Sequence, residues 1–308
     1  MAVDLLDAVP PDHRSGFVAV VGRPNVGKST LMNALLGQKL AIVSPKPQTT
    51  RNRILGILTL DDLQAIFIDT PGIHRPRHKL GEFMLAEALS ALPDADLVLW
   101  VVDSSRLPND EDRQVATAVR RETLPVILVM NKIDITPPAV LAEHAPLYRS
   151  LLPTVTAEIA ISALTGQGVS AVVELLRHYL PPGPRYYPPD QMTDVQERFL
   201  AAELIREKAL LHLREEVPYA VAVDLEEFAE RPGGVVYIAA RLFVERPSQK
   251  GILIGHEGNM LKRIGSEARQ EIEQMLDKRV YLDLRVVVKP KWRRNPAELR
   301  RLGYTRRR

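Results

Sequence analysis

Two patterns of apolar and polar positions divide this chain. Between residues 17 and 180, short apolar runs alternate with stretches that have the length and period of helices. Stretches such as 79–92 and 110–121 predict helices, and five apolar runs predict strands, namely 17–21, 63–68, 97–102, 126–130 and 155–161. This alternation predicts an α/β domain that has a mostly parallel sheet with helices on both faces.

A proline-rich stretch ends this pattern. Residues 181–189 read Pro-Pro-Gly-Pro-Arg-Tyr-Tyr-Pro-Pro. Because proline lacks an amide hydrogen and fixes φ, the stretch neither continues a helix nor pairs in a central strand. It predicts a linker between two domains, which we place at 181–192.

Beyond the linker the order of elements changes. The patterns predict a helix over about 193–214, two strands, two helices that flank Gly255-His256-Glu257-Gly258, and a last strand. The three predicted strands are 220–228, 235–244 and 280–288. This order, α-β-β-α-α-β, predicts a smaller α+β domain. The predicted divisions are an N-terminal arm (1–15), a first domain (16–180), the linker (181–192), a second domain (193–294) and a basic C-terminal tail (295–308).

Composition agrees with a two-domain protein of the cytosol. The chain has 308 residues, which exceeds what one compact domain usually holds, and it contains no cysteine. Disulfides, thiolate zinc sites and thiol nucleophiles are therefore excluded, and a reducing compartment is favoured. Residues 1–15 do not resemble a signal peptide, and no apolar run approaches the ~20 residues of a membrane span. We expect a soluble, cytoplasmic protein.

Positive charge is concentrated at one end of the chain. The net charge is +3, yet residues 289–308 hold nine Lys or Arg against the single acid Glu298. The remainder of the chain is therefore acidic. This distribution predicts a local contact with a polyanion and not a generally basic surface.

The most specific motif directly follows the first predicted strand. It reads Gly22-Arg23-Pro24-Asn25-Val26-Gly27-Lys28-Ser29, fits the phosphate-loop pattern, and leads into a helix at Thr30. In such a loop the backbone N–H groups wrap the β-phosphate, Lys28 neutralises β- and γ-oxygens, and Ser29 Oγ ligates Mg²⁺. The alternative is a chance glycine-rich turn.

Two further segments predict contacts with the γ-phosphate and its metal. Asp69-Thr70-Pro71-Gly72 ends a predicted strand, so Asp69 is expected to hold Mg²⁺ through water and Gly72 to offer its N–H to the γ-phosphate. The loop Gln48-Thr49-Thr50-Arg51 lies between the phosphate-loop helix and the next predicted strand. We expect Thr50 Oγ to be the second Mg²⁺ ligand, with Thr49 as the competitor and ordinary loop threonines as the alternative.

Two more strand ends carry the groups that guanine requires. In Asn131-Lys132-Ile133-Asp134, the Asp134 carboxylate is expected to accept the N1–H and 2-amino hydrogens, which adenine lacks. Asn131 and Lys132 would brace the base, and Ser162-Ala163 lies where a backbone N–H can reach guanine O6. Alone, such patterns also occur as helix caps or turns. Four motifs in this order, each at a strand end, predict GTP and GDP as the ligands.

These motifs resemble the Era family of bacterial ribosome-assembly GTPases. The resemblance rests on the phosphate loop, on Gln48 to Arg51, and on the stretches 203–208, 216–219 and 251–255 of the second domain. It implies a P-loop GTPase domain followed by a type II KH domain, which would clamp about four nucleotides of single-stranded RNA. It also implies slow hydrolysis of GTP to GDP and phosphate. In this family the nucleotide state would control KH binding to the 3′ end of 16S rRNA during assembly of the 30S subunit.

One position departs from many GTPases. The residue after Gly72 is Ile73, where a glutamine often orients the attacking water, and Ile73 cannot do so. The resemblance implies that Lys28, Thr50 and Gly72 carry catalysis, with Asn25 helping to hold a K⁺ ion as an extra charge. Arg51, Arg53, Arg75 and Arg77 are interpreted as solvated loop charges and not as arginine fingers.

The Gly-x-x-Gly turn at 255–258 predicts the RNA contact. Glycines let a nucleic-acid backbone approach closely, and the following helix N-terminus favours phosphate; a plain helix-turn-helix is the alternative. Here Glu257 stands where a basic residue is common, which should weaken the phosphate contact. The candidate RNA-binding residues are Lys250, Gly255, His256, Gly258, Lys262, Arg263, Lys289, Lys291 and Arg293, with Arg294 beside them.

Two other functions were weighed. A GTPase of tRNA modification would need a catalytic or cofactor-binding second domain, and no such residues are seen. A peripheral membrane contact through the basic end is implied for the family and is compatible with RNA binding. Arg306 to Arg308 are expected to be a tail, and the protein is expected to be a monomer.

Overall fold

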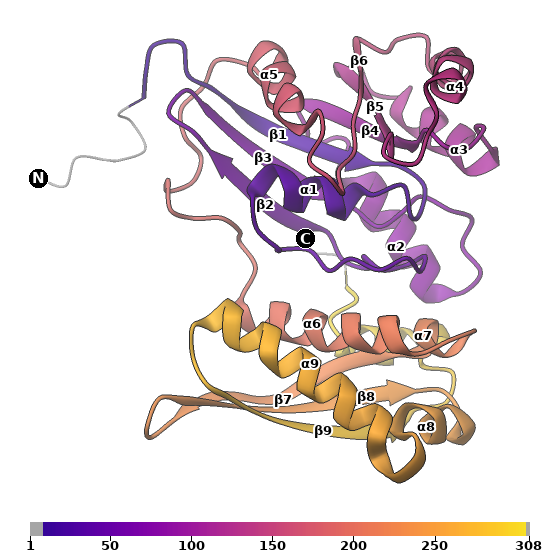
Figure 1. The fold of residues 1–308 in the computed structure, drawn as a ribbon, viewed down its shortest axis with the longest axis vertical. Helices are drawn as coiled ribbons and strands as arrows, with labels where there is room; N and C mark the ends of the chain where they lie inside the picture. The colour runs from indigo at the N-terminus through magenta and orange to yellow at the C-terminus, as the bar shows by residue number, and fades with distance from the viewer. Residues whose placement is uncertain (1–8, 306–308) are drawn as a thin grey trace, which may run out of the picture. The chain divides into compact units, whose positions relative to one another are not determined.

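The computed structural model describes residues 9–305, and these fall into two compact units (Figure 1). Unit 1 combines the chain up to Ala41 with Thr50–Pro76 and Met84–Asp194. Unit 2 combines Ile42–Thr49 and Arg77–Phe83 with the chain from Val195 onward. Residues 1–8 of the predicted arm and 306–308 of the predicted tail lie outside the described residues.

Unit 1 is built on a six-stranded sheet in the order β2-β3-β1-β4-β5-β6. All neighbouring pairs are parallel except β2 with β3, so the mostly parallel sheet predicted from the sequence is confirmed. The strands are β1 (Arg14–Val21), β2 (Ile54–Thr59), β3 (Leu63–Asp69), β4 (Leu97–Asp103), β5 (Val126–Asn131) and β6 (Ala157–Ala160). Every residue of β3, β4 and β5 is buried, which explains why these strands are mostly apolar and why Gln64 is the one polar residue inside them before their polar last residues.

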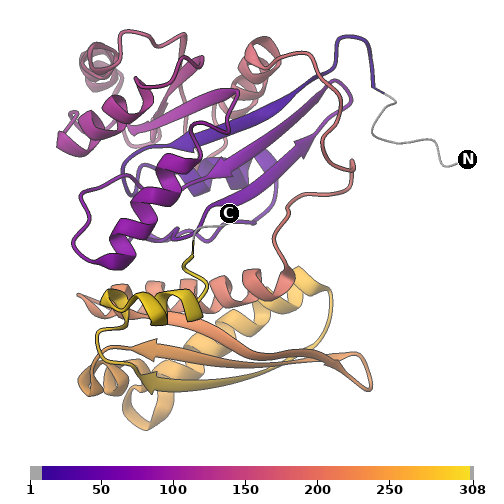
Figure 2. The same ribbon diagram turned by 180° about the vertical axis from the view of Figure 1, so that it is seen from behind.

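Helices cover both faces of this sheet, as Figures 1 and 2 show from opposite sides. Helices α1 (Lys28–Leu36) and α5 (Val169–Tyr179) contact each other, and α1 also packs on β2 and β3. The other face carries α2 (Lys79–Ser90), α3 (Asp110–Val119) and α4 (Pro138–Leu151), whose apolar side chains share one core with Trp100 and Tyr148. No helix within residues 9–305 is both long and apolar enough to cross a membrane.

Unit 2 contains the order of elements predicted for the second domain, with the short helix α7 and the short turn η1 added. Its elements are α6 (Glu197–His212), α7 (Val217–Ala220), β7 (Ala222–Arg231), β8 (Val235–Val244), α8 (Pro247–Ile254), η1 (His256–Gly258), α9 (Asn259–Leu276) and β9 (Val280–Val288). The sheet order is β7-β8-β9, antiparallel between β7 and β8 and parallel between β8 and β9. The predicted order α-β-β-α-α-β is therefore confirmed.

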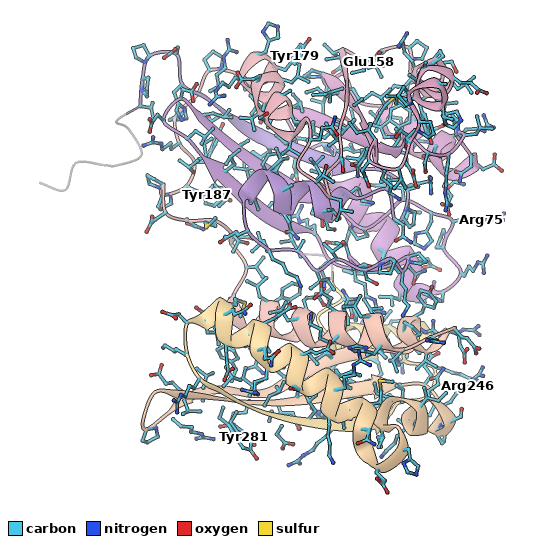
Figure 3. All side chains as sticks on the ribbon, viewed as in Figure 1. Arg75, Glu158, Tyr179, Tyr187, Arg246 and Tyr281 are labelled. Atoms are coloured by element: carbon cyan, nitrogen blue, oxygen red, sulfur yellow. The ribbon has the colours of Figure 1, made fainter. Side chains whose placement is uncertain are left out.

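Helices cover one face of the sheet of unit 2, and the other face is covered in part, since Phe243 is 1% exposed and the Arg301 guanidinium lies 4.8 Å from its ring centroid. Helices α6 and α9 pack against each other and bury Ile238 and Leu242 of β8 in a shared core. The opposite face carries Tyr237 and Tyr281, whose rings stack at 5.6 Å. Tyr281, labelled in Figure 3, lies on the side of the sheet away from α6 and is 63% exposed.

The segment predicted as a basic tail, 295–308, contains regular structure. Residues Pro296–Arg301 form helix α10, which follows the turn η2 (Trp292–Arg294) at the end of the predicted second domain. Leu299 and Tyr304 are buried, and Tyr304 stacks on the fully buried Trp292 at 6.0 Å between ring centroids. Trp292 Nε1 donates a hydrogen bond to Ala220 O at 2.9 Å, so residues up to Tyr304 belong to the packed part of unit 2.

Candidate nucleotide site and nucleic-acid interface

The phosphate loop joins β1 to α1 at the carboxyl edge of the sheet of unit 1. Gly27 has φ +100°, and a Cβ on it would lie 2.2 Å from Asn131 Nδ2. A Cβ on Gly22 would lie 2.3 Å from Val101 O. Both positions therefore require glycine, because the loop passes against neighbouring strand ends. The loop leads directly into the N-terminus of α1, where backbone N–H groups favour an anion.

Lys28 is buried at the first position of α1. Its Nζ donates to the backbone oxygens of Gly22 and Arg23 at 3.1 and 3.0 Å. Burial lowers the pKa of Lys28 to about 8, and the nearby Asp69 carboxylate acts in the opposite direction. An anionic phosphate at the loop would favour the charged form of this lysine.

The three predicted magnesium ligands lie together. Ser29 Oγ donates to Asp69 Oδ2 at 2.7 Å and lies 2.8 Å from Thr50 Oγ1, which in turn lies 3.4 Å from Asp69 Oδ2. Asp69 is fully buried and, among residues 9–305, its Oδ1 has no hydrogen-bond partner. Burial raises the pKa of Asp69, although Ser29 and Lys28 act to lower it. Two hydroxyls and an under-satisfied carboxylate are oxygen ligands that suit Mg²⁺.

This cluster holds a single carboxylate. Within the described part of the chain, no three His, Cys, Asp or Glu side chains are grouped as a metal site. Magnesium in such a site takes its remaining ligands from water and phosphate oxygens, as in other P-loop proteins. The competitor Thr49 donates its Oγ1 to Lys46 O at 2.7 Å, so the geometry favours Thr50.

The segment after Asp69 approaches the phosphate loop closely. Thr70 Oγ1 donates to Val20 O at 2.8 Å, which fixes the start of the segment against β1. A Cβ on Gly72 would lie 2.6 Å from the backbone nitrogen of Pro24, so no larger residue fits there. Ile73 is 2% exposed and points into the core, where it cannot orient a water molecule.

Asn131 joins the guanine motif to two other loops. Its Nδ2 donates to Val26 O at 2.8 Å, and its Oδ1 accepts from Ala163 N at 2.9 Å. Asp134 is exposed, and its Oδ1 accepts from Ser162 Oγ at 2.7 Å. The structure thus brings together the phosphate loop, Asn131 to Asp134, and Ser162-Ala163, which are far apart in sequence.

Arg23 lies in the phosphate loop, but its side chain pairs with two carboxylates and not with a phosphate. Its Nε lies 3.2 Å from Asp112 Oδ2, and its Nη2 lies 3.8 Å from Asp103 Oδ2. Only the backbone of Arg23 thus remains for a phosphate. Asp103 and Asp112 were not among the residues predicted from the sequence. Asp103 ends an apolar strand as Asp69 does, and this position could have indicated it.

The Gly-x-x-Gly turn forms an exposed projection between α8 and α9. Gly255 and Gly258 have φ of +74° and +77°, and a Cβ on Gly258 would meet no atom within 4 Å. The side chains of His256 and Glu257 are 87% and 78% exposed. Gly258 caps the N-terminus of α9, so the turn presents backbone N–H groups to solvent.

The candidate RNA-binding cations differ in their surroundings. Lys262 and Lys291 are exposed. Three others form ion pairs: Lys289 with Glu298 at 3.0 Å, Arg263 with Glu267 at 3.1 Å, and Arg293 with Glu245. A polyanion would compete with these carboxylates for the paired cations.

The fold and the site define a class of protein. Residues 17–132 match the family model described as 50S ribosome-binding GTPase, and residues 216–293 match the KH domain model. Together with the phosphate loop and the Gly-x-x-Gly turn, these matches define a P-loop GTPase domain that is followed by a KH domain.

Comparison with known proteins gives the particular family. The chain is 50% identical over 293 residues to GTPase Era of Geobacter metallireducens, which covers 95% of this chain and 98% of that protein. It is 50% identical over 280 residues to GTPase Era of Thermotoga maritima, covering 91% and 93%. The chain therefore belongs to the GTPase Era family.

Two solved structures resemble the chain over nearly its whole length. One is Era in complex with MgGDPNP and nucleotides 1506–1542 of 16S ribosomal RNA, with a TM-score of 0.92, 41% identity, and coverage of 95% of this chain and 99% of that chain. The other is a variant of Aquifex aeolicus Era bound to GDP·AlF4⁻, with a TM-score of 0.91, 41% identity, and coverage of 94% and 99%.

Proposed function

We propose that this protein binds GTP with Mg²⁺ and hydrolyses it slowly to GDP and phosphate, and that its nucleotide state controls binding of the KH domain to the 3′ end of 16S rRNA. The proposal of GTP hydrolysis rests on the contacts among Ser29, Thr50 and Asp69 beside a phosphate loop. The 41% identity to Era in complex with MgGDPNP and 16S rRNA nucleotides supports the RNA part.

Each predicted nucleotide contact has a physical role. The loop from Gly22 to Ser29 binds the phosphates with its N–H groups, and Lys28 neutralises β- and γ-oxygens. Ser29 and Thr50 would ligate Mg²⁺ directly and Asp69 through water. The ion, when bound, neutralises charge on the phosphates. Asp134 would select guanine, with Asn131 and Lys132 as braces, and the remaining predicted contacts are Thr30, Thr70, Pro71, Gly72, Ser162 and Ala163.

The turnover is expected to be slow because no side chain directly after Gly72 orients water. The buried Ile73 supports this expectation. We propose that Asn25, which has φ +63° in the phosphate loop, helps to hold a K⁺ ion that supplies extra charge in the transition state. Faster GTP hydrolysis in KCl than in NaCl at equal ionic strength is the expected result, and equal rates would remove K⁺ from the mechanism.

The RNA contact is proposed to centre on the turn at 255–258. His256 and the flanking glycines would receive the RNA backbone, and the surrounding cations would bind its phosphates. The match of the KH model over 216–293 leaves no support for the alternative of a tRNA-modification GTPase.

Localisation and assembly follow from this function. We propose a monomer that acts in the cytoplasm on the 30S ribosomal subunit during its assembly. We also propose a peripheral contact with the membrane surface, based on the positive charge of residues 289–308. Co-flotation with anionic vesicles at physiological salt would support it, and recovery only in the unbound fraction would not.

The decisive experiment measures RNA affinity as a function of nucleotide. A fluorescent single-stranded RNA matching the 3′ end of 16S rRNA is titrated with protein at fixed salt, in the presence of MgGDPNP or MgGDP, with a scrambled RNA as control. We expect sequence-specific binding that is tighter with MgGDPNP. Equal binding of both RNAs in both nucleotide states would overturn the RNA-coupled switch and leave the GTPase assignment intact.

A further inference from the structure

Four charged side chains connect the phosphate loop to the guanine motif. Asp103 Oδ2 lies 2.7 Å from Lys132 Nζ and 3.8 Å from Arg23 Nη2, and Asp112 Oδ2 lies 3.2 Å from Arg23 Nε. The side chains of Arg23, Asp103 and Asp112 are 7%, 3% and 0% exposed. We call Arg23, Asp103, Asp112 and Lys132 the charge bridge.

The topology of the sheet explains how Asp103 reaches both loops. Asp103 ends β4 and pairs in register with Asn131 of β5, so Lys132 emerges directly beside it. On its other side β4 pairs with β1, with Trp100 opposite Val21, and β1 leads into the phosphate loop. The last residue of the central strand therefore lies between the two halves of the nucleotide site.

The carboxylate of Asp103 is held in one orientation. Ser105 donates to its Oδ1 from the backbone nitrogen at 3.2 Å and from Oγ at 2.6 Å, which leaves Oδ2 for Lys132. Burial acts to raise the pKa of Asp103, but the hydrogen bonds from Lys132 and Ser105 lower it below its usual value. Asp103 is therefore ionised and oriented at neutral pH.

Asp112 fixes the other end of the charge bridge. It lies in the first turn of α3, where its side chain accepts from Asn109 N at 3.1 Å in a capping box. Its contact with Arg23 turns that guanidinium toward α3 and Asp103. The two carboxylates are buried while the Lys132 side chain is 30% exposed, and Arg106 Nε also lies 3.9 Å from Asp103 Oδ2, so each buried carboxylate has at least one cation beside it.

We propose that Asp103 is a positioning residue for the nucleotide, which holds the Lys132 side chain in place for guanine while Arg23 and Asp112 brace Asp103. This inference rests on the proposed function. The Lys132 side chain is 30% exposed, and its Nζ donates to Asp103 Oδ2 at 2.7 Å, so this ion pair limits the orientations that the side chain can adopt. Asn131, its neighbour, is fixed independently by Val26 and Ala163.

Loss of the Asp103 carboxylate should speed the dissociation of both nucleotides. The charge bridge contacts the guanine motif and not the Ser29-Thr50-Asp69 cluster, so it should support GDP and GTP equally. Asp103→Asn is expected to raise the dissociation rate of both nucleotides about tenfold while leaving kcat at saturating GTP within about twofold.

A double-mutant cycle on the full-length protein tests the mechanism. Dissociation of fluorescent GDP and of a fluorescent, non-hydrolysable GTP analogue is measured in Mg²⁺ for wild type, Asp103→Asn, Lys132→Met and the double variant. If Asp103 acts through Lys132, the Asp103→Asn substitution does not change the dissociation rate further in the Lys132→Met background. Additive effects of the two substitutions would overturn the inference, as would a loss confined to GTP.

A milder variant guards against loss of folding in Asp103→Asn. Ser105→Ala removes one hydrogen bond to Asp103 Oδ1, and about a threefold faster dissociation that vanishes in the Lys132→Met background is expected. An unchanged rate in Ser105→Ala together with additive effects in the main cycle contradicts the inference. Failure of the wild type to bind guanine nucleotide would instead contradict the proposed function.

Discussion

Burial of charged groups sets the chemistry of the nucleotide site at the scale of single residues. Lys28 and Asp69 are both buried, and burial favours the neutral form of each side chain. The pKa of Lys28 therefore falls to about 8 and the pKa of Asp69 rises. An anion beside Lys28 and a cation beside Asp69 would restore both charges. The two residues therefore favour phosphate and metal together.

Nucleotide binding should therefore take up protons at mildly alkaline pH. At pH 8 about half of the Lys28 side chains are neutral in the nucleotide-free protein, because the pKa is about 8. Bound phosphate raises this pKa, so a proton is taken up and the affinity for GDP falls as pH rises from 7 to 9. Calorimetry at pH 8 in two buffers with different ionisation enthalpies measures the uptake, and identical heats would contradict it.

The choice between the two loop threonines gives a second prediction. Thr50→Ala should lower the affinity for GDPNP about tenfold relative to GDP, since Thr50 would ligate magnesium only when the γ-phosphate is present. Thr49→Ala is the matched control and should leave the ratio of affinities unchanged. Equilibrium titrations of both nucleotides in Mg²⁺ measure the ratio, and a selective loss in Thr49→Ala would reverse the assignment.

At the scale of elements, short turns between regular structures carry the predicted contacts. The phosphate loop begins α1, and the turn at 255–258 begins α9, so both present a helix N-terminus. They differ in charge, because the phosphate loop has Lys28 while the second turn has the exposed Glu257. The second turn is therefore expected to bind a polyanion weakly by itself and to depend on nearby cations.

Reversing the charge of Glu257 should strengthen RNA binding. Glu257→Lys removes repulsion and adds a phosphate contact, so the affinity for the 16S-like RNA should rise several-fold at low salt, with a salt dependence steeper by about one counterion. Glu143→Lys, which makes the same charge change at an exposed position of α4, is the control. Equal effects of both substitutions would indicate only a change in net charge.

At the scale of the whole chain, unit 2 includes the segment that directly precedes Thr50. Within unit 2, Val43 N donates to Glu207 Oε1 at 2.8 Å, Lys46 Nζ donates to Leu210 O, and Arg206 donates to Thr49 O. Because Thr49 and Thr50 share a peptide bond, any movement of Thr50 toward magnesium acts on the segment that α6 holds. We propose this covalent connection as the route by which nucleotide influences the KH domain.

Hydrogen exchange tests this route. With MgGDPNP, the amides of residues 42–49 should exchange at least about tenfold more slowly than with MgGDP, because the γ-phosphate fixes Thr50. The buried amides of β8 serve as the internal control and should not differ. Equal exchange rates of residues 42–49 in the two nucleotide states would show that this segment does not respond to the γ-phosphate.

The elements that the sequence predicted well are those with a strong local pattern. Strands β3, β4 and β5 are mostly apolar up to their last residues because both faces are covered, and β8 and β9 were predicted at their observed bounds. The edge strand β2 was missed because Gly56 interrupts its apolar pattern. Packing against α1 requires this glycine, since a Cβ there would come 2.7 Å from Leu36 Cδ1. Helix α10 was missed because its many basic residues led to the prediction of a tail, although Leu299 is buried.

The sequence by itself determined the alternation of strands and helices in unit 1, the order α-β-β-α-α-β in unit 2, the phosphate loop and the guanine motif, because each depends on residues that are neighbours along the chain. Only the tertiary structure decided that Thr50 and not Thr49 joins Ser29 and Asp69, and that Asp103 links Arg23 to Lys132. Such contacts depend on which strand ends are adjacent and how deeply they are buried. These are properties of the packed sheet, and no local pattern of residues encodes them.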